Sequence, residues 1–418
     1  MPKVYIIDVT NRDGAQSARI NLSKFQKTMI NWYLNKMGIY QSEFGFPTTW
    51  HEVNYLRTNL ELAKMGVLKP IILSGWIRAI PEDVELTFSQ VSGIEHLNIS
   101  ISTSEQMIQA KWKGRKQFKD ALEDMVRALD LARSKGVRTI GVNAEDASRT
   151  ELLRLVEFAS AAKEHGADRF RYCDTVGCES PEKIAEKIKV IAKMVQIPIE
   201  LHCHNDLGMA VANTVAGTVA AINAGVDAYP NTTILGIGER AGNCDLISLL
   251  LGLKYSSELW DLVDGKIDLS LSWKITNYVA WATGNQIPLH QPGIGEKAFA
   301  HASGIHADAI IKEMKDPRWR TYELYGYEEL GRGEPEFVET GRQILMGDYI
   351  GTKGFRYVCE KYGIELPADD REVVKIWELA RSANIHNHSI LTADELRFIV
   401  SYPDIVWEII TVNRPPEL

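Results

Sequence analysis

The chain has 418 residues, of which 45% are hydrophobic and 24% are charged, and its formal net charge at pH 7 is −8. This composition excludes collagen-like, disordered and disulfide-scaffold proteins. Without a basic excess, neither nucleic acid nor an anionic membrane is expected as the main partner. Polar residues interrupt the most apolar stretch, 208–229, so no membrane span is expected. Five scattered cysteines and an N-terminus without a signal-peptide pattern predict a cytoplasmic enzyme.

The first part of the chain alternates between short β-rich apolar runs and amphipathic helical patterns, about eight times. The predicted strands are residues 4–9, 41–46, 70–74, 96–101, 138–143, 169–174, 197–202 and 228–234. Predicted helices include residues 117–134, 150–165, 181–195 and 207–224. These βα units predict a closed (β/α)8 TIM barrel, because the strands are too apolar to be half-solvated. A doubly wound sheet is the alternative, but the first strand is not followed by a glycine-rich turn.

The alternation stops near residue 262, and the rest of the chain reads differently. Residues 296–349 are rich in glycine and charge, and helical patterns follow at 354–362 and 370–383. We therefore expect a barrel over residues 1–262 and a smaller, mainly helical C-terminal region over residues 263–418.

Polar residues gather where the predicted strands end, which is where TIM barrels carry their active sites. The site candidates read from these strands and their ends are Arg12, Asp13, Gln16, Glu43, Arg78, Asn143, Thr175, Glu200, His202, His204 and Asn243. A barrel with only a structural role would have no need to place so many titratable groups at one rim.

The sharpest local pattern is His202-Cys203-His204. Residues two apart on a strand point to the same face, so both imidazoles can reach one metal ion. The alternative is a pair of histidines that are simply hydrogen-bonded at a polar rim. Asp13 at the same rim favours the metal, because two histidines and one carboxylate leave positions open for substrate and water.

Two other charged segments have two interpretations each. Arg12 beside Asp13 is either a surface ion pair or a fixed cation that stabilises an oxyanion next to a metal. The basic run 111–116 is either a solvated loop, which we favour, or a patch for an anionic cofactor. Cys173 and Cys203 lie at strand ends beside the expected metal, and Cys244 follows Asn243; we expect these thiols to deprotonate and oxidise readily.

Three segments together resemble the signatures of the DRE-TIM metallolyase family. They are DVTNRDGAQ at 8–16, LHCHND at 201–206 and GIGERAGN at 236–243, in the family's order at strands one, seven and eight. A fourth segment, AHASGIHAD at 300–308, is similar to one in the acyl-CoA condensing branch. That branch contains homocitrate, isopropylmalate, citramalate and Re-type citrate synthases.

The resemblance implies a Claisen-type condensation of acetyl-CoA, the co-substrate, with a 2-oxo acid, followed by thioester hydrolysis. It implies one divalent metal (Mn, Mg, Co or Zn) on Asp13, His202 and His204, with Asn243 as a weak ligand. Arg12 would hold the 2-oxo group. His306 would come from a partner subunit and assist proton transfer, in a homodimer with exchanged C-terminal regions. The other implied roles are catalytic for Glu200 and substrate-binding for Gln16, Glu43, Arg78, Asn143 and Thr175.

The prediction of the substrate depends on two positions at which this chain departs from the family pattern. Homocitrate synthases of lysine pathways usually place Arg where this chain has Gly141 and His where it has Ile80, although nitrogenase-associated ones also lack that Arg. Segment 74–79 resembles that of Re-type citrate synthases, in which Arg78 would bind the far carboxylate and Trp76 would close the pocket. Alternatively, Trp76 belongs to the core.

In that alternative, Arg78 pairs with Glu43 or Glu82. We expect oxaloacetate to be slightly preferred over 2-oxoglutarate. The remaining alternatives are a phosphonomethylmalate-type, isopropylmalate or citramalate synthase, or a C–C bond lyase of the same barrel family.

Overall fold

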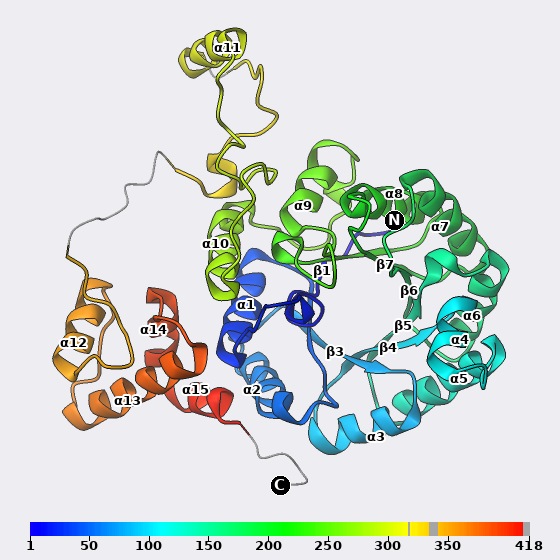
Figure 1. The fold of residues 1–418 in the computed structure, drawn as a ribbon, viewed down its shortest axis with the longest axis horizontal. Coiled ribbons are helices and arrows are strands. Elements are labelled where there is room, and N and C mark those ends of the chain that lie inside the picture. The colour runs from blue at the N-terminus through cyan, green and yellow to red at the C-terminus, as the bar shows by residue number, and fades with distance from the viewer. Residues whose placement is uncertain (317, 334–341, 413–418) are drawn as a thin grey trace.

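The computed structural model describes residues 1–316, 318–333 and 342–412, and eight parallel strands form a closed barrel at its centre (Figure 1). The strands run in chain order around the barrel, and β1 pairs with both β2 and β8. Their bounds are β1 Ile7–Asp8, β2 Gln41–Gly45, β3 Ile72–Arg78, β4 His96–Ser102, β5 Thr139–Glu145, β6 Arg169–Asp174, β7 Ile199–Cys203 and β8 Ala228–Thr232. The predicted TIM barrel is confirmed, and the doubly wound alternative is excluded.

Helices surround the barrel and cover its outer face (Figure 1). They are α1 Lys24–Met37, α2 Val53–Lys64, α3 Pro81–Gln90, α4 Glu105–Trp112, α5 Phe118–Ser134, α6 Leu152–Glu164, α7 Pro181–Val195, α8 Ala210–Asn223 and α9 Leu246–Tyr255. Helix α7 shows why these segments fold this way. Ser180 accepts a hydrogen bond from the Lys183 amide, Pro181 starts the first turn, and the buried positions recur at helical spacing.

Two predicted elements differ from the observed ones for local reasons. The helix expected from residue 207 begins at Ala210, because Gly208 has a left-handed φ of 72° that a helix does not allow. Strand β3 continues to Arg78 because Gly75 and Trp76 pair with Leu97 and Asn98 of β4.

The two faces of the strands differ in polarity. In β6, Phe170 and Tyr172 are fully buried, and Phe170 packs against Phe158 of α6 with ring centroids 6.3 Å apart. Arg169 and Arg171 alternate with them and point into the barrel, where Arg171 is also fully buried. The barrel interior is thus polar, while the apolar core lies between strands and helices.

The C-terminal region is mainly helical, as predicted. Its helices are α10 Ser272–Thr283, α11 Gly304–Lys315, α12 Thr352–Lys361, α13 Asp370–Asn387, α14 Ala393–Ser401 and α15 Pro403–Ile410. Residues 317, 334–341 and 413–418 of this region lie outside the described residues. Helices α13 to α15 pack on α1 and α2; for example, Tyr33 of α1 donates to Asp394 at 2.6 Å and Ser23 donates to Asn387 at 2.6 Å.

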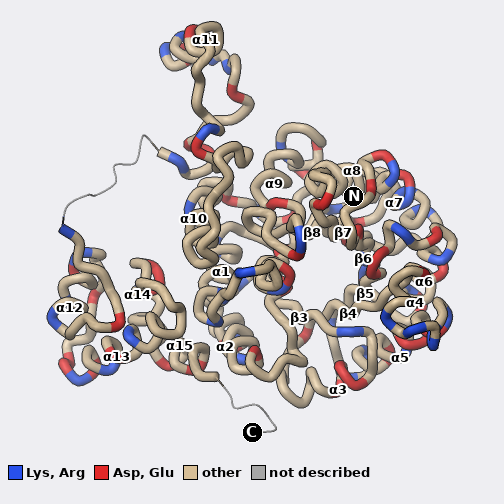
Figure 2. The backbone as a smooth tube through the Cα atoms, in the orientation of Figure 1, with Lys and Arg blue, Asp and Glu red and all other residues tan. Residues whose placement is uncertain are grey.

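Helix α11 is placed differently, because it projects away from both the barrel and helices α12 to α15 (Figure 1). None of its residues is buried. Within the described part of the chain, no helix is both long and apolar enough to cross a membrane. Basic and acidic residues are mixed along the outer helices α4 to α7, in line with the small net charge (Figure 2).

Candidate active site

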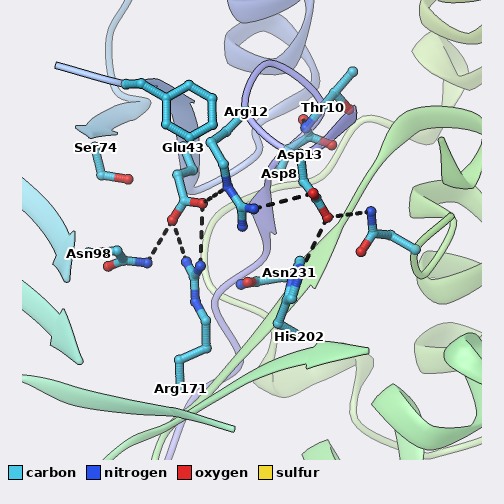
Figure 3. Close-up of polar contacts among 12 residues, drawn as sticks. Asp8, Thr10, Arg12, Asp13, Glu43, Ser74, Asn98, Arg171, His202 and Asn231 are labelled. Carbon is cyan, nitrogen blue, oxygen red and sulfur yellow. Dashed lines mark hydrogen bonds and ion pairs between the residues drawn. The ribbon is translucent and has the colours of Figure 1, made fainter. Parts of the chain in front are cut away.

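A carboxylate and two imidazoles meet at the end of the barrel where the strands terminate. Figure 3 shows Asp13 and one of the imidazoles, that of His202. Asp13 lies just after β1, His202 lies in β7, and His204 follows directly after β7. Asp13 Oδ2 is 3.4 Å from His202 Nε2 and 3.8 Å from His204 Nε2. All three residues are buried, and one donor atom of each lies within 4.8 Å of the others. The predicted same-face arrangement of the two histidines is present.

The loop after β8 holds Asn243 against this group. Asn243 Nδ2 donates to Asp13 Oδ2 at 2.8 Å. The glycines of this loop are needed for close packing: a Cβ on Gly242, whose φ is +89°, would lie 1.9 Å from the Gly236 carbonyl oxygen. A Cβ on Gly238 would lie 2.0 Å from Asn243 Nδ2. The glycine-rich segment therefore brings Asn243 to the rim.

The donor set fits a divalent metal ion. Burial alone would raise the pKa of Asp13, but the Arg12 guanidinium and the hydrogen bond with His202 outweigh it and hold the carboxyl ionised. Burial lowers the pKa of His202, and it lowers that of His204 to about 3, so both imidazoles are neutral. Ionised carboxylate and neutral imidazole are the forms that bind metal. Asn243 Oδ1 is buried with no hydrogen-bond partner among the described residues, which leaves it available as a further ligand.

Arg12 is held beside this group by a buried carboxylate. Its Nε donates to Glu43 Oε1 at 2.5 Å, and its Nη1 lies 3.4 Å from Asp13 Oδ1. Although burial opposes it, the charges of Arg12 and Arg171 lower the pKa of Glu43 to about 2. Arg12 is only 7% exposed. The Arg12–Asp13 ion pair is therefore an interior feature and not a solvated surface contact.

Arg171 is the residue of this cluster that sequence reasoning missed. Its guanidinium contacts Glu43 (Figure 3). It also contacts Glu200, with Arg171 Nε 2.8 Å from Glu200 Oε1. Arg169 Nε donates to the other oxygen of Glu200 at 2.7 Å, and Asn231 Nδ2 donates to Glu200 Oε1 at 2.9 Å. The sequence did contain a signal for Arg171. Arg169 and Arg171 are two residues apart in a mostly apolar strand, so both side chains are expected on the same, inner face.

Glu200 lies in this ion cluster with both carboxylate oxygens occupied. Burial would raise its pKa, but Arg171 and Arg169 outweigh burial and lower it. A carboxylate held ionised between two arginines is a weak proton acceptor. The geometry therefore suits Glu200 to orienting Arg171 better than to transferring a proton.

Three predicted residues lie near the cluster or at its edge. Asn143 is buried beside Trp76 and Arg171. Gln16 is exposed and lines a pocket at the rim together with Lys24, Lys27 and His51. The Thr175 hydroxyl accepts a hydrogen bond from the Asp146 amide at 2.9 Å, so it orders the ends of β5 and β6.

Two predicted residues are not brought into the cluster. The Arg78 side chain is 66% exposed and forms two hydrogen bonds with Asp83, of 2.9 and 2.7 Å, instead of pairing with Glu43 or Glu82. His306 lies on the projecting helix α11, where its ring stacks on Tyr322 with centroids 3.8 Å apart. Sequence reasoning also missed Tyr322, because nothing in the spacing predicted this stacking.

The remaining expectations concern the basic loop and the thiols. Lys111 pairs with Glu145 and Lys116 pairs with Asp124, which fits the interpretation as a solvated loop. Burial works against the easily deprotonated thiols that the sequence led us to expect. Burial raises the pKa of Cys173, of Cys203 and, to about 12, of Cys244.

Comparisons with known proteins agree with this geometry. Residues 3–279 match the family model described as HMGL-like, and residues 294–386 match the one described as homocitrate synthase post-HMGL domain-like. Hydroxymethylglutaryl-CoA lyase from Pseudomonas aeruginosa shares the fold, with a TM-score of 0.56 and 18% identity over 75% of this chain and 99% of that one.

Among characterised relatives, the chain is 54% identical to Citrate (Re)-synthase of Dehalococcoides mccartyi over 99% of both proteins. It is 38% identical to 2-isopropylmalate synthase 2 of Caldanaerobacter subterraneus over 89% of this chain and 88% of that protein. It is 33% identical to homocitrate synthase 1 of a Nostoc strain over 96% of this chain and 97% of that protein. The predictions of an enzyme and of its family are confirmed, and the chain belongs to the HMGL-like (DRE-TIM) family, in the branch that carries a homocitrate synthase post-HMGL domain.

Proposed function

We propose that this protein is a Re-type citrate synthase, which condenses acetyl-CoA with oxaloacetate, in preference to 2-oxoglutarate, and hydrolyses the thioester. The observation that carries this proposal is the buried Asp13–His202–His204 group with Arg12 3.4 Å from Asp13. The 54% identity to Citrate (Re)-synthase over nearly the whole chain supports the choice of substrate.

In this proposal, Asp13, His202 and His204 hold one divalent ion of the Mn, Mg, Co or Zn type, with Asn243 Oδ1 beside them. Such an ion polarises the 2-oxo group as a Lewis acid. The Arg12 guanidinium stabilises the negative charge that develops on the oxo oxygen when the carbon–carbon bond forms. Glu43 fixes Arg12, Arg171 holds Glu43, and Glu200 holds Arg171, so the cation is already oriented before substrate arrives.

Removing a proton from the acetyl methyl group requires a base near the barrel mouth. We assign this step to His306 of the partner subunit, in a homodimer that exchanges part of its C-terminal region. Helix α11 supports this assignment, because it projects from its own barrel and exposes Ile305, Ile311 and Met314. An isolated helix with an unburied apolar surface is stabilised by packing against a second chain.

We further propose that residues 1–262 supply the barrel half of the site and that residues 263–418 complete it. Only the segment around α11 is exchanged between subunits, since α13 to α15 pack on α1 and α2 of their own chain. The five unpaired cysteines, Cys173, Cys178, Cys203, Cys244 and Cys359, support a reducing, cytoplasmic location. Gln16 and Thr175 keep their proposed roles at the substrate rim. The exposed Arg78 would have to leave Asp83 before it could bind a carboxylate.

Lysine-pathway homocitrate synthesis is disfavoured by the barrel interior. A Cβ on Gly141 would lie 2.3 Å from Asn98 Oδ1 and 3.1 Å from Glu200 Oε2, so the arginine typical of those enzymes could be placed there only if Asn98 moved. Because homocitrate synthases without this arginine also exist, 2-oxoglutarate stays the second candidate substrate.

The test is release of free CoA thiol from acetyl-CoA with oxaloacetate, 2-oxoglutarate, pyruvate and 2-oxoisovalerate, with and without EDTA. We expect the highest kcat/KM with oxaloacetate and loss of turnover in EDTA, restored by Mn²⁺ or Mg²⁺. A preference for either monocarboxylate, or full activity after chelation, would contradict the proposal.

A further inference from the structure

A network of buried polar side chains lies outside the barrel, where β2 packs against helix α1 and α1 packs against α2. Its five members are fully buried: Asn11 in the loop after β1, Asn31 on α1, Ser42 in β2, and Tyr55 and Asn59 on α2. The layer between strands and helices is mainly apolar, so polar groups there are costly unless they find hydrogen-bond partners.

Asn31 is at the centre of this network. Its Oδ1 accepts hydrogen bonds from Asn11 Nδ2 and from Ser42 Oγ, each at 2.8 Å. Its Nδ2 donates to Asn59 Oδ1 at 3.0 Å and to the Tyr55 hydroxyl at 3.2 Å. All four hydrogen-bonding positions of the amide are therefore used, which fixes the direction in which it faces.

Two partners of Asn31 are chain neighbours of the Arg12–Glu43 ion pair. Asn11 directly precedes Arg12, and Ser42 directly precedes Glu43. Successive residues of a strand point to opposite faces, so Ser42 reaches α1 while Glu43 points into the barrel and contacts Arg12. One side-chain oxygen on α1 thus holds the chain next to each member of the ion pair.

The chain on the other side of Glu43 is held by the same network. Between Glu43 and Gly45 the pairing of β2 with β3 shifts, which leaves Phe44 as an extra residue. The Tyr55 hydroxyl, which accepts from Asn31, donates to the Phe44 carbonyl oxygen at 2.8 Å. Bulges beside active sites re-aim a side chain. Here the residues on both sides of Glu43 are tied to the network, so its direction is fixed.

Stability alone does not account for these polar groups. Asn11 Oδ1 is buried with no hydrogen-bond partner among the described residues, which destabilises the folded state. Replacing hydrogen-bonded partners together by apolar side chains of the same shape is nearly neutral or even stabilising. The network is better explained by the single arrangement that its directed hydrogen bonds impose on the chain.

We propose that Asn31 is a positioning residue for the reaction, which holds Arg12 and Glu43 in the relative placement that lets them pair. It is buried outside the barrel, so it acts only through the chain next to each of them. This inference rests on the proposed function, in which Arg12 stabilises the charge that develops on the oxo oxygen. Because that charge exists only while the carbon–carbon bond forms, a displaced guanidinium lowers kcat more than it raises KM.

The direct test is Asn31→Leu, which removes all four hydrogen bonds of the amide. We expect kcat with oxaloacetate to fall by about tenfold or more. Asn11→Leu and Ser42→Ala each remove one donor to Asn31 and leave the rest of the network in place, so they test the inference if Asn31→Leu does not fold. We expect each to lower kcat by about three- to tenfold and to change KM by less than about twofold.

Asn213→Leu is the matched control. Asn213 on α8 is also buried, its Nδ2 donates to the Glu179 carbonyl oxygen at 2.9 Å, and its Oδ1 also has no partner among the described residues. The substitution should lower the midpoint of urea unfolding, as Asn11→Leu does, but leave kcat and KM unchanged. Crystal structures of both variants and the wild type, grown with Mn²⁺, give a readout besides activity. We expect the contact between Arg12 and Glu43 to be lost in Asn11→Leu alone.

Three results would each overturn the inference: equal kcat values in Asn11→Leu and Asn213→Leu, a loss confined to KM, or an unmoved Arg12 in the Asn11→Leu crystal structure. If the wild-type enzyme releases no CoA with any acid, the proposed function fails. In that case the crystal structures decide this inference, since the position of Arg12 does not depend on turnover.

Discussion

The barrel mouth and helix α11 carry the two halves of the proposed site, and they are built in opposite ways. At the mouth, Arg12, Asp13 and His202 are 7%, 3% and 5% exposed, and each is hydrogen-bonded or ion-paired to a neighbour. On α11, none of the residues is buried, and His306 contacts only the ring of Tyr322 and, more distantly, that of His301 among the ring contacts described.

The comparison shows which part of the chemistry one chain can organise by itself. Groups that must hold a charge in place are fixed by a network within the barrel, where low solvent access strengthens every ion pair. The group proposed to move a proton is exposed on a separate helix and becomes enclosed only when another surface meets it. Breaking each half separately should therefore have different consequences.

The largest effect is expected from removing the centre of the barrel half. Asp13→Asn or His204→Ala should lower kcat by more than about 100-fold, the loss typical of removing one fixed electrostatic group. Both variants should also bind less metal, as measured by elemental analysis after gel filtration. Asp404→Asn, at an exposed residue of α15, is the control with the same chemical change, and it should retain both metal and activity. Full metal content in Asp13→Asn would contradict the assignment.

The second prediction separates the two halves by mixing. Asp13→Ala and His306→Ala proteins, each inactive alone, should recover about a quarter of wild-type activity when co-refolded in equal amounts. Half of the dimers are mixed, and each mixed dimer has one intact site. Asp13→Ala mixed with His202→Ala should recover nothing, because both defects lie in the barrel. Absence of recovery in the first mixture would show that His306 serves its own chain or none.

The third prediction compares the stability of ion pairs in the two regions. Glu43→Gln leaves Arg12 and Arg171 buried without their shared partner and should destabilise the protein by about 3–5 kcal/mol. Asp316→Asn, next to α11, breaks a pair with Arg318 whose side chains are 39% and 80% exposed, and it should leave stability nearly unchanged. Midpoints of urea unfolding measure both, and equal shifts would contradict the comparison.

The smallest effect concerns the junction of α14 with the barrel. Burial raises the pKa of Glu395 from its ordinary value of 4.5 to about 7. Tyr278 and Asn387 donate to it, each at 3.0 Å, with Thr392 on its other oxygen and Asp394, Tyr33 and Lys274 nearby. The folded state thus keeps this proton to higher pH than the unfolded state.

The stabilising contribution of protonated Glu395 is fully present below pH 4.5. It is lost as the pH rises through 7, which lowers the free energy of unfolding by up to about 3 kcal/mol. Urea midpoints at pH 5 and pH 8 should differ less in Glu395→Gln than in the wild type. Glu408→Gln, exposed on α15, should behave like the wild type. If the urea midpoint rises with pH in the wild type but not in Glu395→Gln, the effect of Glu395 on stability is opposite to the expected one.

Much of this architecture could be predicted because local patterns and the fold agree. The strand predicted at 169–174 matches β6, and the helix predicted at 181–195 matches α7, since an apolar run and a capped amphipathic helix leave few alternatives. Asp13, His202 and His204 could be placed together because β1 and β7 end at the same rim. For these three residues, the barrel topology alone predicts that they lie close together.

What sequence could not give was the pairing within the barrel. Arg171 reaches Glu43 across 128 positions of chain, and Arg78 turns to Asp83 instead of the pocket, although both arginines lie on strands that border the mouth. These choices depend on side-chain lengths and on competing partners in three dimensions. The stacking of His306 on Tyr322 is of the same kind.

The absence of a side chain at Gly141 has an evolutionary consequence. Any larger residue there meets Asn98 and Glu200, which also contact Arg169 and, through it, the rest of the ion network. A mutation that introduced a new carboxylate-binding arginine at this position would therefore be lost unless Asn98 or its partners had already changed. The order of substitutions is constrained, and a change of substrate in this lineage has to begin at the supporting residues before it reaches the one that contacts the ligand.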